Sequence, residues 1–103
     1  MCPVHVETRP GADGRAVLHV SGEVDIQFAG ELRDAGLAAA ADSGLAINLA
    51  EVSFIDSTGL AVLIEINNTI RLRGQALTLI APSRSVRHIL EVTGLEPVFA
   101  VIE

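Results

Sequence analysis

The sequence predicts an α/β fold in which a mixed β-sheet is covered by helices, in the order β-β-α-β-α-β-α-β. Short apolar segments of strand length alternate with longer segments of helical spacing, and helices of this length between strands require parallel pairings. A turn-rich segment near the N-terminus adds an antiparallel hairpin. The 103 residues, half of them hydrophobic, fit one core, so we expect a single domain over residues 1–103.

Two strands are predicted at residues 4–8 and 16–21, on either side of the turn-rich residues 10–14. A turn centred near Ala12 places alternate residues of both strands on one face, which we expect in the core: Val4, Val6, Leu18 and Val20.

The same register places His5 opposite His19 on the other face. Two imidazoles can contribute to a metal site, but the sequence shows no third ligand beside them. The single cysteine, Cys2, has no second thiol, and His88 lies in a later helix without a suitable ligand spacing. We therefore expect a solvated histidine pair, no metal site and no cofactor.

The first helix is predicted at residues 28–41, with Phe28, Leu32, Ala35 and Ala39 at helical spacing, and ends at residues 42–44. A buried strand follows at residues 45–49. Residues 53–56 are expected to form a short connector.

The second helix is predicted from about Thr58 to Arg73, and Gly74 ends it. A strand at residues 77–80 follows. Pro82 and Ser83 open a third helix that reaches Thr93, and a last strand covers residues 98–102.

Charge excludes several classes of partner. Thirteen acidic and seven basic residues give a formal net charge of −6, so no basic footprint for nucleic acid or for an anionic membrane is present. No apolar run approaches the roughly 20 residues that cross a bilayer, and the N-terminus lacks the pattern of a signal peptide. We expect a cytoplasmic protein without membrane insertion.

The residues Asp56-Ser57-Thr58-Gly59 stand at the entrance to the second predicted helix. One interpretation is capping, in which Asp56 or Ser57 accepts a hydrogen bond from the helix backbone, worth about 1 kcal/mol. The other is phosphate chemistry, because a helix N-terminus favours an anion beside an exposed hydroxyl. Gly59 would let another backbone approach closely.

The chain shows no catalytic apparatus, and we expect that it is not an enzyme. Aspartic proteases have one residue between Asp and Gly, whereas Asp56 and Gly59 are separated by two, and the pattern here is not all-β. No glycine lies two residues before Ser57 to form a nucleophile elbow. A phosphate-binding loop of the Gly-Lys type requires a lysine, which the sequence lacks.

Three segments in this order resemble the successive motifs of the STAS-domain anti-sigma factor antagonists: residues 22–25 (Gly-Glu-Val-Asp), 47–49 (Ile-Asn-Leu) and 54–60 (Phe-Ile-Asp-Ser-Thr-Gly-Leu). Thr93-Gly94-Leu95 fits the same family before the last strand, and the resemblance covers nearly the whole chain.

The resemblance implies that Ser57 is phosphorylated by an anti-sigma factor that is also a serine kinase. It also implies which residues shape the environment of that serine: Asp25, Asn48, Asp56, Thr58 and Gly59. Thr58 stands where the family has a second serine. Several relatives carry a further C-terminal helix after the last strand, and this sequence does not.

The expected function is a partner switch. The unphosphorylated protein binds the kinase and releases a sigma factor, and phosphorylation of Ser57 ends the binding; a serine phosphatase is a further expected partner. STAS domains also serve as subunits of lipid-transport ABC systems and anion permeases and in stress-signalling assemblies, and this alternative stays open. A chain of this length that retains Asp56 and Ser57 favours the antagonist.

A partner-binding surface is expected on the second helix. At 100° per residue, Val62, Leu63, Ile66 and Ile70 form a core stripe. The residues outside the stripe give a mixed apolar and polar surface that starts beside Ser57: Leu60, Ile64, Asn67 and Arg71. The alternative is that Leu60 and Ile64 flank a broad core.

Overall fold

The computed structural model describes residues 4–11, 15–40 and 44–103. Within these residues, the predicted order of strands and helices is confirmed, with one short 3-10 helix (η1) added before the last strand. The elements are β1 (His5–Pro10), β2 (Ala16–Val24), α1 (Ala29–Ala39), β3 (Leu45–Ile55), α2 (Ser57–Arg71), β4 (Leu77–Ile80), α3 (Arg84–Thr93), η1 (Glu96–Val98) and β5 (Ala100–Ile102).

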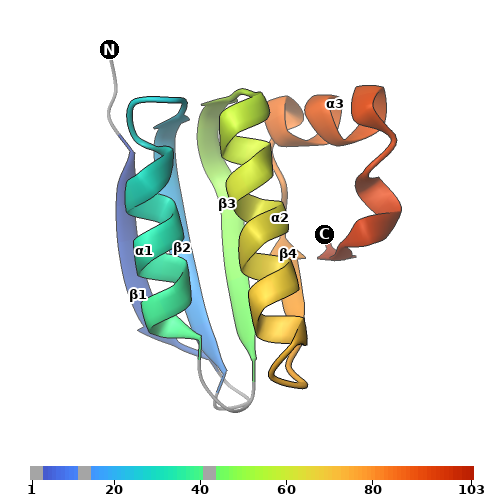
Figure 1. Cartoon of the computed structure of the whole chain (residues 1–103). Coiled ribbons are helices and arrows are strands. Elements are labelled where there is room, and N and C mark those ends of the chain that lie inside the picture. Colours follow the sequence, from blue (N-terminus) through green and yellow to red (C-terminus); the bar gives the residue numbers. More distant parts are fainter. Residues whose placement is uncertain (1–3, 12–14, 41–43) are drawn as a thin grey trace.

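The five strands form one mixed sheet in the order β1-β2-β3-β4-β5. β1 pairs with β2 in an antiparallel hairpin, and the three other pairings are parallel. Helices α1 and α2 lie side by side on one face of the sheet, and α3 lies across its end (Figure 1). Both α1 and α2 begin at the edge where the parallel strands end, so that edge gathers two helix N-termini.

The core lies between the sheet and these two helices. Leu18, Ile47 and Leu79 occupy matching positions on three adjacent strands, and each is fully buried. Burying each such side chain stabilises the fold by about 1.5–3 kcal/mol. Gly36 lets α1 approach α2 closely, since a Cβ at that position would lie only 2.7 Å from Cδ1 of Ile66.

The hairpin register differs from the prediction. Glu7 lies opposite His19, and His5 lies opposite Ser21, so the expected pairing of the two histidines is wrong. The pairing is centred one residue later in the chain than expected, which moves each partner by two positions and keeps the same residues on the core face. Three parts of the chain discussed above lie outside the described residues: Cys2, the predicted turn centre at Ala12, and the predicted helix end at residues 42–43.

Several element ends also differ from the prediction. β3 runs through residues 53–55, which were expected as a connector, because Glu23 and Val24 of β2 continue the pairing. Phe28 precedes α1 as its N-cap residue and is not part of the helix. The last strand starts at Ala100, because Pro97 cannot donate a sheet hydrogen bond and its fixed φ favours the 3-10 turn of η1.

The ends of α3 are those that the sequence predicts. The Ser83 hydroxyl accepts a hydrogen bond from the N–H of Val86, and Gly94 ends the helix in the left-handed conformation with φ 71°. None of the helices in the described part of the chain is long and apolar enough to cross a membrane.

Candidate functional site

The candidate site lies where β2 and β3 end side by side. Val24 pairs with Ile55, and each is the last residue of its strand. Asp25 and Asp56 follow directly, so the parallel pairing brings the two aspartates out at the same edge. The N–H of Asp56 also donates to the carbonyl of Val24 at 3.2 Å, which extends the pairing by one residue.

Asp56 caps α2. Its backbone is extended (φ −109°, ψ −173°), and Oδ1 accepts a hydrogen bond from the N–H of Gly59 at 3.0 Å. Its carbonyl accepts from the N–H of Leu60 at 3.0 Å. Of the two capping residues that the sequence allowed, the structure therefore uses Asp56.

Ser57 is the first residue of α2, and its side chain is exposed. Within the described residues, its hydroxyl has no hydrogen-bond partner, because Asp56 already does the capping. A helix leaves its first N–H groups without intrahelical partners. Asp56 accepts hydrogen bonds from the N–H groups of Gly59 and Leu60. The N–H groups of Ser57 and Thr58 remain available to an anion bound at this end of the helix.

Asp25 holds the chain before α1 in a similar way. Its Oδ1 accepts from the N–H of Gln27 at 3.0 Å and of Phe28 at 3.1 Å, and its carbonyl accepts from the N–H of Ala29 at 2.8 Å. Both carboxylates at this edge are therefore oriented by backbone hydrogen bonds.

Gly59 is buried against the end of β2. A Cβ there would lie 2.7 Å from the carbonyl oxygen of Val24 and 2.7 Å from Cγ1 of Ile55. The expected close approach of another backbone at Gly59 is thus confirmed. The first turn of α2, with the half-buried Thr58 and the exposed Ser57, is fixed against the two strand ends.

The chain matches known proteins over most of its length. A family model described as "Mlab, STAS domain" matches residues 8–102. An anti-sigma-B factor antagonist of Listeria monocytogenes is 33% identical over 86 residues, which are 82% of this chain and 75% of that protein. The chain belongs to the STAS-domain family of anti-sigma factor antagonists. Members of this family are regulators and not enzymes, as expected.

Solved structures share the STAS fold. An anti-sigma factor antagonist from Mycobacterium paratuberculosis is 28% identical and superposes with a TM-score of 0.78 over 96% of this chain and 85% of that chain. The Bacillus cell fate determinant SpoIIAA in its phosphorylated form is 19% identical, with a TM-score of 0.69 over 96% of this chain and 92% of that chain. At that identity, the second similarity shows the fold alone.

Asn48 of this STAS domain does not lie at the site. It is seven residues before the end of β3, which is about 23 Å along a strand. Its side chain accepts a hydrogen bond from the N–H of Ala50 at 3.0 Å. The structure therefore does not bring Asn48 to the serine, because the motif that contains it lies within the strand and not at its end.

Asn48 instead borders a hollow of about 240 Å³ on the sheet, together with both histidines of the hairpin. In this hollow, the guanidinium of Arg9 lies 3.0 Å from the carboxylate of Glu7 and lowers the pKa of Glu7 by a hydrogen bond and by its charge. No group of three His, Cys, Asp or Glu side chains in the described ranges is arranged to hold a metal ion.

The expected binding surface on α2 needs correction. Leu60 and Asn67 are only 4% and 3% exposed, so neither belongs to an accessible surface. Ile64 is half-buried against the core, and Arg71 is exposed. The buried side of α2 is broader than one stripe because this helix packs against α1 as well as against β3 and β4. The alternative of a broad core describes Leu60 and Ile64 better.

Two exposed apolar side chains near Ser57 were not identified from the sequence. Ile26 is 80% exposed and follows Asp25, and Phe54 is 45% exposed and comes two residues before Asp56. Phe54 sits beside the exposed Ser53, a polar neighbour that could have signalled a solvent-facing strand end. Both side chains belong to the two segments that carry the aspartates of the site.

Proposed function

We propose that this STAS domain binds an anti-sigma factor that is a serine kinase, thereby releases a sigma factor, and is switched off when that kinase phosphorylates Ser57. The observation that carries the proposal is the exposed, unbonded hydroxyl of Ser57 beside an aspartate that already caps the helix. The name of one similar protein, an anti-sigma-B factor antagonist that is 33% identical, supports the antagonist role.

The position of Ser57 suits a kinase substrate. The hydroxyl is accessible without unfolding any element, because Ser57 is exposed at the first position of α2, just beyond the end of β3. A phosphate there lies at the positive end of the helix dipole and next to the N–H groups of Ser57 and Thr58. Phosphorylation therefore leaves α2 folded, and the switch acts at the surface.

The partner contact is proposed at the same edge. Ile26 and Phe54 are exposed apolar side chains in the two segments that carry the aspartates, and the proposed contact includes them together with Ser57. A phosphate adds about −1.5 to −2 charges beside Asp25 and Asp56. Covering these two side chains would then require removal of water from the phosphate as well, which is costly for an unpaired charge. Loss of affinity follows.

Phosphopeptide mapping tests the proposal. We expect incubation with the cognate kinase and ATP to place one phosphate on Ser57 and none on Ser57→Ala. Ser53→Ala is the matched control, since Ser53 is an exposed serine four residues away, and it should be labelled like the natural chain. Label that persists in Ser57→Ala, or that lies mainly on Thr58, contradicts the assignment.

A second candidate function is a subunit of a membrane transporter or of a stress-signalling assembly. The observation in its favour is that the matching family model is described as Mlab and not as an antagonist. Capture of partners from a lysate of the source organism separates the two functions. A small ATP-binding kinase supports the antagonist, whereas a membrane ATPase or permease supports the second candidate.

A further inference from the structure

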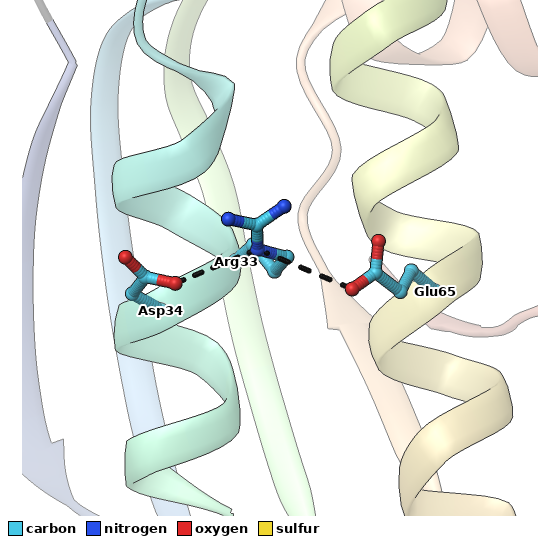
Figure 2. Close-up of polar contacts among 3 residues, drawn as sticks. All are labelled: Arg33, Asp34 and Glu65. Carbon is cyan, nitrogen blue, oxygen red and sulfur yellow. Dashed lines mark hydrogen bonds and ion pairs between the residues drawn. The ribbon is translucent and has the colours of Figure 1, made fainter.

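Arg33 of α1 lies in the groove between α1 and α2, where its contacts are weak. Its Nε is 3.5 Å from Oδ1 of Asp34 and 4.0 Å from Oε2 of Glu65 on α2 (Figure 2). Both distances exceed the 2.7–2.9 Å that is typical of a charge-assisted hydrogen bond. The three side chains are also 44%, 77% and 50% exposed, so water competes for each of them. Arg33 is thus free to exchange partners at little cost.

The guanidinium of Arg33 extends toward the Ser57 end of the groove. α1 and α2 run side by side in the same direction (Figure 1), and Gly36 of α1 lies level with Ile66 of α2. Counting back six residues on both helices places Gly30 level with Leu60. Nη2 of Arg33 is 3.9 Å from the position of a Cβ on Gly30, so this nitrogen already lies near that level.

Ser57 lies three residues beyond Leu60, which is about 4.5 Å along the helix axis. Ser57, Ala61 and Glu65 are spaced by four residues and so lie along one side of α2, the side on which Glu65 meets Arg33. A phosphate ester lengthens the Ser57 side chain on this side of α2. An arginine side chain that is released from Glu65 can therefore reach it by rotation about its own bonds.

We propose that Arg33 binds the phosphate of phosphorylated Ser57 and leaves Glu65 to do so. This inference rests on the proposed phosphorylation of Ser57. A phosphate carries about −1.5 to −2 charges, against −1 for the Glu65 carboxylate, and it accepts the two parallel hydrogen bonds that a guanidinium donates. The charged groups that oppose this attraction at the same edge are Asp25, Asp56 and Glu31.

Arg84 is the competing cation at this edge of the sheet. It begins α3, whose main contacts are with β3 and η1, whereas Arg33 lies in the groove that α2 itself forms. The position of Arg33 favours it as the phosphate ligand.

The transfer changes the surface away from Ser57. When Arg33 moves to the phosphate, Asp34 and Glu65 lose their shared cation, and the middle of the groove becomes more negative. Phosphorylation then alters two regions of the surface that a partner meets. An aspartate at position 57 is shorter and carries less charge, so we expect it not to draw Arg33 away from Glu65.

The test uses the chain with phosphoserine installed at position 57 during synthesis, so that no kinase is needed. Titration of the phosphate by ³¹P NMR measures its pKa, which is about 6 for an ordinary phosphoserine. We expect Arg33→Gln to raise this pKa by roughly 0.5, because a nearby cation favours the doubly charged form. Arg71→Gln, at the other end of α2, is the matched control and should leave the pKa unchanged, as should Arg84→Gln.

A second measurement follows the Arg33 side chain directly. Its Nε–H resonance should shift when Ser57 carries the phosphate and should not shift in Ser57→Asp. The proposal is overturned if Arg33→Gln and Arg71→Gln give the same phosphate pKa, or if Arg84→Gln alone raises it. Failure to find a kinase would count against the proposed function and leave this titration unaffected, so the two failures are distinguishable.

Discussion

The carboxylate of Asp56 accepts a hydrogen bond from the N–H of Gly59 at 3.0 Å, so Ser57, which lies between them in sequence, is not needed to cap the helix. In many helices, a serine in this neighbourhood is the cap itself, and its modification would weaken the helix. Here the cap is the residue before it. The capping residue and the proposed phosphorylation site are thus adjacent side chains, and each can be changed separately.

Removal of the Asp56 side chain should destabilise the fold. We expect Asp56→Ala to lower the free energy of unfolding by about 1–2 kcal/mol, because the N–H of Gly59 loses its acceptor. Asp56→Asn is the control, since an asparagine oxygen accepts the same hydrogen bond and should keep most of the stability. Urea denaturation measures both. If the two variants lose the same stability, the charge of Asp56 and not the hydrogen bond is responsible.

An acidic residue in place of Ser57 should affect binding and not folding. We expect Ser57→Asp to bind the kinase about 2 kcal/mol more weakly, roughly thirtyfold in Kd, with Tm within a few degrees of the natural chain. Ser57→Asn has a similar shape without the charge and should bind more tightly than Ser57→Asp. Calorimetric titration and thermal melting measure these effects. Unfolding of Ser57→Asp would show instead that the serine is structural.

Gly59 should tolerate no side chain. An alanine methyl group would meet the Val24 carbonyl, which is held in the sheet and cannot move aside, so we expect Gly59→Ala to cost about 1–3 kcal/mol of stability. Gly30→Ala is the matched control on α1: its nearest contact is 3.9 Å away, and better helix propensity should stabilise the fold by up to about 1 kcal/mol. Equal effects in chemical denaturation would contradict the close packing at Gly59.

The apolar residues at the edge should contribute to partner binding. We expect Ile26→Ser and Phe54→Ser each to weaken kinase binding by more than about 1 kcal/mol, as for anchor residues of an interface. Ile26→Ser should change stability by less than about 0.5 kcal/mol, because its side chain is 80% exposed. Leu72→Ser is the control, because Leu72 is 90% exposed just after α2 ends, and its binding should be unchanged. Equal losses in all three variants would place the interface elsewhere.

The sequence predicts α3 well because residues at both of its ends mark them. Ser83 and Gly94 bracket α3, and both act at the positions that the sequence indicates. The strand end at residues 53–55 was missed because Phe54 breaks the alternation of buried and exposed residues, and its place in β3 depends on pairing with Glu23 of a distant segment. Strand pairing between distant segments depends on the tertiary structure, and the local pattern of hydrophobic residues does not predict it.

The same distinction applies to the site. The position of Ser57 beside a capping aspartate follows from local sequence, and the structure agrees on that geometry. The burial of Leu60 and Asn67 does not follow from local sequence, because it depends on how α2 packs against α1 and the sheet. The location of Asn48 depends likewise on the length of β3.

Only Asp56 separates the last residue of β3 from the first residue of α2. Its N–H donates to the carbonyl of Val24 in β2, and its carboxylate accepts from the N–H of Gly59 in α2. The serine therefore has no hinge on either side and is presented to a partner in one fixed orientation. Binding at this edge then orders little backbone, so little of the interaction energy is lost to conformational entropy. With a rigid backbone at this position, the proposed phosphorylation of Ser57 would act on binding directly, without a slow rearrangement of the fold.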